Sequence, residues 1–299
     1  MQLRKVLHGT GVALVTPFKS NYEIDFDGLG RVIDFVIDGG VEYVVTLGTT
    51  GETPTLDRSE KIEVANYTFE KVNGRVPVVI GVGGNNTHEL IRDLNTFPLE
   101  KAVAVLSASP YYSKPSQDGL YFHYKALAEN SMKPLILYNV PGRTGRNLNA
   151  TTTIKLAREV ANIGGIKEAS GDMAQCMQIL RDRPEDFLVV SGDDALVLPQ
   201  IACGMDGVIS VAANCFPKYF SEMTRLCLNG DFKAAKEIND RLIEGYDLLF
   251  AENNPAGVKA FLAELELIQN NLRLPLVPLS EALAAKVRAY MNKQVGIEI

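Results

Sequence analysis

The sequence lacks the features that mark a membrane protein or a nucleic-acid-binding protein. No apolar run approaches the roughly 20 residues that a bilayer-spanning helix needs. Near the start, only the apolar pair Val6-Leu7 precedes His8-Gly9, so no signal-peptide core forms there. The formal net charge is −6 without a long basic block, which makes nucleic acid and anionic membranes unlikely partners. We therefore expect a soluble globular protein that stays in the cytoplasm.

Cysteine and histidine are also scarce. The four cysteines stand in apolar stretches without C-x-x-C spacing, which predicts reduced, buried thiols at Cys176, Cys203, Cys215 and Cys227. With three histidines in the chain and no carboxylate partner at fixed spacing for Asp193-Asp194, we expect no metal site. Nucleotide-binding loops are incomplete too: Gly81-Val-Gly-Gly84 lacks a third glycine, and GTTGE at 48–52 lacks the Lys-Ser/Thr of a P-loop.

The sequence does contain a regular alternation of strand-like and helical segments. The helical period over residues 29–37 stops at Gly39-Gly40, and Asp57 to Glu60 resembles a capping box. Apolar or β-branched runs begin near residues 11, 43, 77, 101, 134, 163, 187 and 207. Such runs, separated by about one helix each, predict a parallel sheet covered by helices. Eight of them favour an α/β fold of the closed (β/α)8 TIM-barrel type, with an open doubly wound sheet as the alternative.

The strand signals cease after Asn214. Helical patterns follow at residues 217–228, 232–250, 255–268 and 280–291. The first would complete the barrel, and the other three predict a C-terminal helical appendage. We therefore expect a barrel catalytic domain over residues 1–229 and a helical domain over residues 230–299.

Polar side chains follow several of the predicted strands. A barrel of this kind carries its chemistry at the C-terminal ends of its strands. Hydroxyls, phenols, a guanidinium and an amine would meet there, contributed by GTTGE at 48–52, Tyr111-Tyr112, Tyr138, Arg143, Lys167 and Gly192-Asp193-Asp194. We expect the functional site at this mouth.

Lys167 is the most unusual of these residues, because it stands in the apolar, glycine-flanked strand GGIKEAS. Side chains alternate along a strand, so Lys167 and Ala169 share one face while Ile166 and Glu168 share the other. One register points the amine into the barrel, where burial disfavours the ammonium and leaves free amine to form a Schiff base with a carbonyl. In the alternative, the lysine points out of the mouth or pairs with Glu168 or Asp172.

A Schiff base to a keto acid requires proton transfer, because the carbinolamine must lose water and the imine must become an enamine. Tyr138 and Tyr112 are candidate acid-base groups, and a threonine hydroxyl can connect them as donor and acceptor. Either tyrosine could instead pack its ring and bond to a backbone carbonyl. Arg143 can bind a substrate carboxylate with two hydrogen bonds, or can pair with an acidic neighbour at the surface.

These motifs occur together in one family. Over nearly its whole length the chain resembles the dihydrodipicolinate synthases, within the pyruvate-dependent class I aldolases, through GTTGE, PYY at 110–112, YNVPGRTG at 138–145, GIKEAS at 165–170, SGDD at 191–194 and GVISV at 207–211. The resemblance implies condensation of pyruvate with L-aspartate 4-semialdehyde in lysine and diaminopimelate biosynthesis. It also implies a homotetramer built as a dimer of dimers, without a cofactor or metal.

The resemblance further implies roles for individual residues. Lys167 would form the Schiff base, Tyr138 would donate and accept protons, and Thr49 and Tyr112 would complete a relay to solvent. Tyr111 would lie across a dimer interface, close to the relay of the neighbouring subunit. The substrates would be bound by Thr50 and the backbone of Ile209 at the pyruvate carboxylate, by Gly192, and by Arg143 at the semialdehyde carboxylate.

Two alternatives remain at this stage. The N-acetylneuraminate lyases share the lysine and the strand-end tyrosine, but they typically carry a serine at the position of Thr49 and lack an arginine matching Arg143. A catalytically silent barrel that binds a keto acid as a regulator is the second alternative. The intact lysine, tyrosines and threonines count against it.

An inhibitory lysine site at the dimer interface is a further implication of the resemblance. In sensitive members of the family, this allosteric site uses residues that match Asn85, Glu89 and Tyr111, together with two histidines. This chain has Arg58 and Lys61 at the histidine positions. Two cations would repel the ammonium of lysine, so we expect inhibition to be weak or absent.

Overall fold

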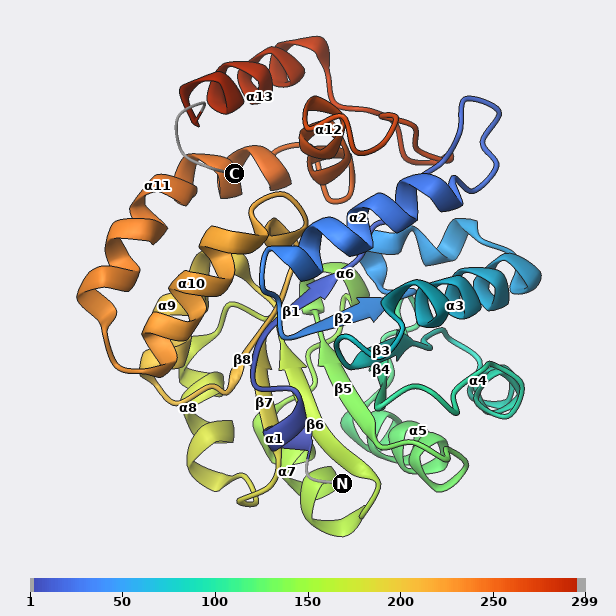
Figure 1. Cartoon of the computed structure of the whole chain (residues 1–299). Coiled ribbons are helices and arrows are strands. Elements are labelled where there is room, and N and C mark those ends of the chain that lie inside the picture. The colour runs from blue at the N-terminus through green and yellow to red at the C-terminus, as the bar shows by residue number, and fades with distance from the viewer. Residues whose placement is uncertain (1–2, 295–299) are drawn as a thin grey trace.

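The computed structural model describes residues 3–294 and contains a closed parallel β-barrel (Figure 1). The strands follow each other around the barrel in chain order: β1 (Gly9–Ala13), β2 (Tyr43–Thr46), β3 (Val78–Gly81), β4 (Ala104–Ala108), β5 (Leu135–Asn139), β6 (Ile163–Glu168), β7 (Leu188–Ser191) and β8 (Gly207–Ser210). Pairing of β8 with β1 closes the sheet, which confirms the barrel and excludes the open sheet. Residues 1–2 and 295–299, at the outer ends of the two predicted domains, lie outside the described residues.

The strands are apolar on both faces because each face packs against a different core. Alternate residues, such as Val45 and Val79, fill the barrel interior, while Val44 and Val78 pack against the surrounding helices. The barrel closes tightly at Gly207, where a Cβ would lie 2.0 Å from the Gly9 carbonyl oxygen. Glycine is therefore required for the contact between β8 and β1.

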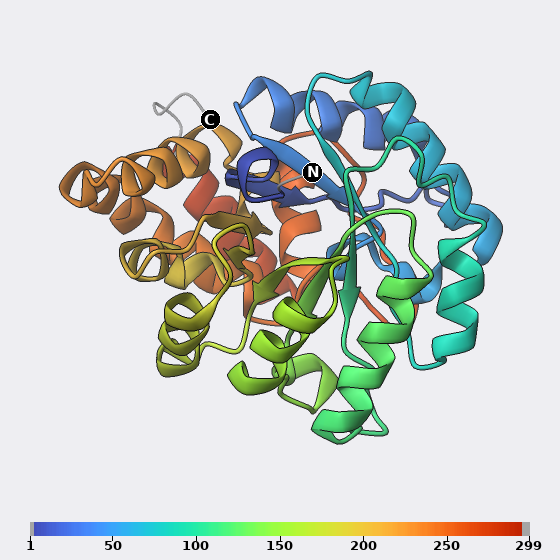
Figure 2. The ribbon, with the colours of Figure 1, turned by 90° about the horizontal axis from the view of Figure 1, so that it is seen from below.

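Helices surround the barrel, as seen from below in Figure 2. The short α1 (Leu3–Val6) precedes β1, and the later helices of the barrel are α2 (Phe26–Asp38), α3 (Arg58–Val72), α4 (Thr87–Leu94), α5 (Gln117–Glu129), α6 (Pro141–Thr144), α7 (Ala150–Glu159), α8 (Met173–Asp182), α9 (Val197–Ala202) and α10 (Pro217–Leu228). The helix predicted before Gly39 is α2, and the predicted capping box opens α3 with Asp57 and Glu60 bonded reciprocally. Short 3-10 turns follow three strands at η1 (Thr49–Gly51) with η2 (Thr53–Thr55), η3 (Asp194–Leu196) and η4 (Ala212–Asn214).

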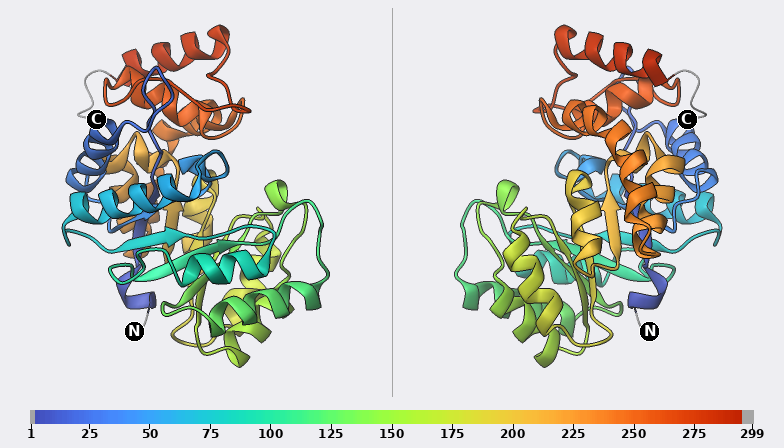
Figure 3. Two further views of the ribbon diagram at one scale, coloured as in Figure 1. Left: turned by 90° about the vertical axis from the view of Figure 1, so that its right-hand side faces the viewer. Right: turned by 90° about the vertical axis from the view of Figure 1, so that its left-hand side faces the viewer.

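The C-terminal helices are α11 (Phe232–Phe250), α12 (Ala256–Glu264) and α13 (Glu281–Gln294). They gather beside α10 and α2 (Figures 1 and 3). The predicted bounds of α10 and α11 are confirmed, but the helix predicted over 255–268 ends at Glu264. Its continuation is interrupted because Glu266 adopts a positive φ of 58°.

One of the four cysteine predictions is wrong. All four thiols are free, but Cys203 is exposed, whereas Cys176, Cys215 and Cys227 are buried. Cys203 caps the C-terminus of α9, where the chain turns through Gly204 at the surface. The apolar residues before Cys203 form the buried side of α9, whereas Cys203 itself lies at the exposed end of the helix. No helix in residues 3–294 has the length and apolar character to cross a membrane.

Candidate active site

A cavity of about 540 Å³ opens at the C-terminal ends of the strands. Most of the predicted catalytic and substrate-binding residues line it: Thr49, Thr50, Tyr138, Arg143, Lys167 and Gly192. The wall is completed by residues of α11 and the segment after it, including Tyr246, Asp247, Phe250 and Asn254. The C-terminal helices therefore contribute directly to the candidate site.

Lys167 points into this cavity and is only 5% exposed. Ala169 lines the cavity with it, as the alternation of side chains predicts. Glu168 faces the other way and accepts hydrogen bonds from Asn139 Nδ2 and Gln175 Nε2, each at 3.0 Å. The alternative in which Lys167 pairs with Glu168 is therefore excluded by the direction of the strand.

The amino group of Lys167 lies against an aromatic ring. Its Nζ is 4.4 Å from the ring centroid of Tyr138, its neighbour in the pairing of β5 with β6. Within residues 3–294, no carboxylate forms an ion pair with this amine, and Asp172 instead caps α8. A Cβ on Gly192 would lie 2.7 Å from Lys167 Cε, so glycine there keeps open the space around the amine. The amine thus faces the cavity without a protein counter-ion in contact.

The loop after β2 presents two threonines to the cavity. Thr49 and Thr50 belong to η1, and Thr50 is 2% exposed. Thr50 Oγ1 accepts a hydrogen bond of 3.0 Å from Asn254 Nδ2, and the carbonyl of Gly51 accepts one of 2.7 Å from Thr16 Oγ1. Buried contacts on both sides therefore fix the position of the loop.

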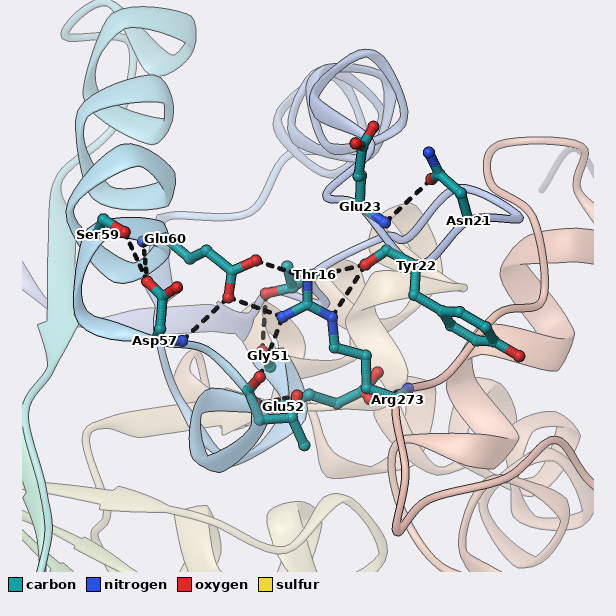
Figure 4. Close-up of polar contacts among 11 residues, drawn as sticks. Thr16, Asn21, Tyr22, Glu23, Gly51, Glu52, Asp57, Ser59, Glu60 and Arg273 are labelled. Carbon is teal, nitrogen blue, oxygen red and sulfur yellow. Dashed lines mark hydrogen bonds and ion pairs between the residues drawn. The ribbon is translucent and has the colours of Figure 1, made fainter.

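The same loop is anchored through Glu52, which is buried and has a left-handed backbone with φ 52°. Its carboxylate forms an ion pair with Lys259 of α12 and accepts a 3.1 Å hydrogen bond from the backbone N–H of Arg273. Figure 4 shows the Arg273 side chain reaching from this point to Glu60 and the Tyr22 carbonyl. Burial lowers the pKa of Lys259 to about 8, and the Arg273 guanidinium lowers that of Glu60.

Arg143 stands on α6, at the mouth of the cavity, and is exposed. Its Nη2 donates to Asn253 Oδ1 at 3.1 Å and to the carbonyl of Asn254 at 3.3 Å. No acidic side chain among the described residues forms an ion pair with it. Neutral acceptors orient the guanidinium and leave its charge available to a carboxylate ligand.

The sequence placed Asp194 at the mouth, within SGDD, and raised it as a metal ligand, but its structural role was not predicted. Asp194 is 2% exposed, and its Oδ2 accepts hydrogen bonds from the backbone N–H groups of Val211 at 3.1 Å and Ala212 at 2.9 Å. It therefore holds the end of β8 to the end of β7. Burial raises the pKa of Asp194 to about 6, although the backbone donors and the charge of Lys167 act in the opposite direction.

Five of the predicted residues do not line the cavity. Tyr112 is 92% exposed and has a positive φ of 68°, which turns the chain at the surface, so the relay predicted with Thr49 and Tyr138 is not assembled within one chain. Ile209 is buried in the barrel interior.

The remaining three residues, those of the predicted lysine site, lie elsewhere on the chain. The N–H of Tyr111 donates to Asn85 Oδ1 at 2.8 Å, and Glu89 pairs at 3.7 Å with Arg92. Asn85 and Tyr111 are therefore brought together, and the lysine site itself stays a prediction.

Known proteins match the chain over most of its length. Residues 6–294 match the sequence profile of the Dihydrodipicolinate synthetase family. The chain is 49% identical over 287 residues to the 4-hydroxy-tetrahydrodipicolinate synthase of Phocaeicola vulgatus, covering 96% of this chain and 97% of the relative. The crystal structure of dihydrodipicolinate synthase from Aquifex aeolicus matches with a TM-score of 0.93 and 40% identity, covering 96% of this chain and 98% of the other. A structure described as a monomeric dihydrodipicolinate synthase variant matches with a TM-score of 0.95 and 37% identity, covering 98% and 99%.

Proposed function

The chain belongs to the dihydrodipicolinate synthetase family, and we propose that it condenses pyruvate with L-aspartate 4-semialdehyde to give 4-hydroxy-tetrahydrodipicolinate. The enzyme class is a lyase of the class I aldolase type. The observation that carries the proposal is the position of Lys167, whose amine lies in the cavity beside Tyr138. A buried amine of this kind can serve as the nucleophile that forms a Schiff base.

In the first step, Lys167 Nζ attacks the C2 carbonyl of pyruvate and forms a carbinolamine. Loss of the hydroxyl as water, with a proton supplied by the Tyr138 hydroxyl, gives the imine. Thr50 donates a hydrogen bond to the pyruvate carboxylate. The resemblance assigns the backbone of Ile209 to the same carboxylate, although Ile209 lies within β8 and does not line the cavity. Gly192 leaves room for the substrate next to the lysine.

In the second step, the Tyr138 phenolate left by the first step takes a proton from C3, which converts the imine to an enamine and restores the Tyr138 hydroxyl. The enamine carbon attacks the aldehyde carbon of the semialdehyde, and the new alkoxide takes a proton from Tyr138. Arg143 binds the carboxylate of the second substrate. The amine of that substrate then attacks C2 and displaces Lys167, which closes the ring, so that one water is released overall.

A complete proton relay requires a second copy of the chain. Tyr112 is almost fully exposed, and its side chain is outside the cavity of its own subunit. We propose that Tyr112 enters the relay of a neighbouring subunit, next to Thr49, within a homotetramer built as a dimer of dimers; this changes the prediction from the resemblance, which gave the crossing position to Tyr111. The cytoplasm is the proposed location, in keeping with a biosynthetic enzyme.

Feedback inhibition by lysine is expected to be weak or absent. Arg58 and Lys61 replace the two histidines of the inhibitor site, and Arg58 Nε lies 3.3 Å from Asp93 Oδ1. This pairing neutralises part of the Arg58 charge, but the pair of cations still disfavours an ammonium ligand.

The test is pyruvate consumption with L-aspartate 4-semialdehyde, compared with N-acetylmannosamine as the acceptor. We expect turnover with the semialdehyde and loss of that turnover in Lys167→Ala. Lys125→Ala is the control and should change little, because Lys125 is at the surface, where its Nζ lies 3.9 Å from Glu129 Oε1. Turnover with the sugar in place of the semialdehyde would move the protein to the lyase reaction. No turnover with either acceptor would contradict the proposed function.

A further inference from the structure

Two adjacent asparagines between α11 and α12 contact both of the proposed carboxylate-binding side chains. The side chain of Asn254, which is 4% exposed, donates to Thr50 Oγ1 at 3.0 Å. The side chain of Asn253 and the carbonyl of Asn254 accept hydrogen bonds from Arg143. A short segment of the C-terminal region thus reaches two strand ends that are far away in the sequence.

The hydrogen bond from Asn254 determines what Thr50 can offer to a ligand. A threonine hydroxyl has one proton and can also accept hydrogen bonds. When Asn254 Nδ2 occupies the accepting side, the proton of Thr50 remains available, and none of the described residues accepts it. Because Thr50 lines the cavity, its proton is directed to an acceptor within the cavity.

Asn253 fixes the backbone of the same segment. Its φ is 91°, in the region that favours glycine and is tolerated by asparagine. Its Oδ1 accepts from the N–H of Asn254 at 2.9 Å as well as from Arg143 at 3.1 Å. This closed turn places the Asn254 carbonyl toward Arg143, while the Asn254 side chain is held separately by its own bond to Thr50.

We propose that Asn254 and Asn253 are positioning residues for the two substrates separately. The amide of Asn254 makes Thr50 a hydrogen-bond donor for the carboxylate of the keto acid. The side chain of Asn253 orients Arg143 for the carboxylate of the second substrate. This inference rests on the proposed function and extends it to specificity: each carboxylate has its own positioning residue, and the two residues are neighbours in the chain.

The experiment is steady-state kinetics, with each substrate varied in turn, on Asn254→Asp, Asn254→Ala and Asn253→Gly. In Asn254→Asp the new carboxylate accepts the Thr50 proton and repels the keto acid. We expect the KM for pyruvate to rise about tenfold or more, since charge-assisted hydrogen bonds are the strong ones. Asn254→Ala should raise it by a smaller factor, and both variants should leave the KM for the semialdehyde within about twofold.

Asn253→Gly provides the matched comparison, because glycine accepts the positive φ and removes only the side chain. We expect it to raise the KM for the semialdehyde and to leave the KM for pyruvate nearly unchanged. A general loss of structure does not produce this crossed pattern, because it affects both substrates. Variants that raise both KM values equally, or that lower kcat alone, would overturn the inference.

A double-mutant cycle keeps the test valid if Asn254→Asp does not fold. In a Thr50→Val background the hydroxyl is absent, so Asn254→Ala should raise the KM for pyruvate no further, whereas additive effects would overturn the inference. Calorimetric titration with pyruvate separates the two proposals. If wild type binds pyruvate without turning over, the proposed function fails, and the inference stands only if Asn254→Asp binds at least about tenfold more weakly.

Discussion

At Asp194, burial and hydrogen bonding oppose each other. The side chain is enclosed, and its pKa is raised to about 6, while two backbone N–H groups at the end of β8 favour the carboxylate. Its Oδ1 has no hydrogen-bond partner among the described residues. Ionisation of Asp194 strengthens its contacts to Val211 and Ala212 but places a charge in an enclosed site, and because the cost of burial is the larger effect, the protonated form favours the folded state.

The stability of the protein should therefore depend on the ionisation of Asp194. The pKa of aspartate in an unfolded chain is about 3.9. Because the folded pKa is higher, the favourable contribution is complete below about pH 4 and is lost as the pH rises through about 6. We expect the free energy of unfolding of wild type, minus that of Asp194→Asn, to fall by roughly 3 kcal/mol over this range. Urea unfolding at a series of pH values measures it.

The control for this titration is Asp118→Asn, which changes an exposed aspartate in the first turn of α5. The free energy of unfolding of wild type minus that of Asp118→Asn should not show the fall with pH that is expected for Asp194→Asn. The free energy of unfolding of wild type minus that of Asp194→Asn could instead stay constant or rise with pH. Either result would contradict the assignment of the raised pKa to Asp194.

At the residue scale, alternation along the strand predicted that Lys167 shares a face with Ala169 and not with Glu168, but it left open whether that face points into the barrel. Lys167 and Ala169 face the cavity, and Glu168 faces away. The roles of Asp194 and Asn254 were not predicted, because each depends on a contact with a distant segment. Their neighbours Val211 and Thr50 lie 17 and 204 residues away in the sequence. No local spacing encodes such a contact.

At the scale of elements, the loop that contains η1 and η2 is held in place by the C-terminal region. The loop carries the two threonines, and its Glu52 is paired with Lys259 in a fully buried ion pair. Lys259 also donates to the Asn271 carbonyl at 2.9 Å and lies 4.2 Å from the ring centroid of Phe18. Buried pairs contribute little net stability but are costly to break, because one charge then remains uncompensated.

Breaking this pair from one side should therefore be strongly destabilising. We expect Glu52→Gln to lower the free energy of unfolding by about 3–5 kcal/mol, measured by urea unfolding. The double variant Glu52→Gln with Lys259→Met removes both charges, and we expect it to be less destabilised than the sum of the two single variants. Additive losses in the double variant would show that the ion pair is not the source of the effect.

Element boundaries were predictable where the hydrophobic period is strong and a cap is local. The bounds of α10 and α11 and the capping box of α3 follow from sequence alone. The end of α12 and the exposure of Cys203 were not predicted, because each depends on a turn with positive φ, at Glu266 and Gly204. The residues on both sides of each turn are apolar, so the hydrophobic pattern gives no sign that the helix ends there.

At the scale of the whole molecule, the barrel supplies the reactive groups and the C-terminal helices complete the cavity. The number of strand-like runs predicted the barrel, but periodicity carries no information on which helix covers the mouth. The boundary predicted at residues 229/230 falls between α10 and α11 and remains a prediction. Because α11 and the loop after it line the cavity, we expect the barrel without them to lack a complete site.

The proposed role of Tyr112 across subunits predicts complementation. Tyr112→Phe and Lys167→Ala chains should each have little activity alone. Co-expressed in equal amounts, they should regain about a quarter of the wild-type rate, because half of random dimers are mixed and each mixed dimer has one complete site. Tyr22→Phe is the control and should remain active alone, because the Tyr22 side chain is exposed and does not line the cavity. A rate equal to the mean of the two separate variants would contradict an exchange of Tyr112.

Lysine sensitivity is a second property of the assembly. Titration of wild type with L-lysine should leave most of the activity intact, while Arg58→His with Lys61→His should gain sensitivity because the two permanent cations are removed. Strong inhibition of wild type at low lysine concentration would contradict the prediction.

The central claim is that Lys167 forms a covalent imine with pyruvate. Incubation with pyruvate followed by borohydride reduction, with intact-mass and peptide mass spectrometry, tests it most directly. We predict one reduced pyruvate adduct per chain, located on Lys167 and absent from Lys167→Ala. Pyruvate turnover by wild type without any adduct, or an adduct on another lysine that persists in Lys167→Ala, would contradict the account.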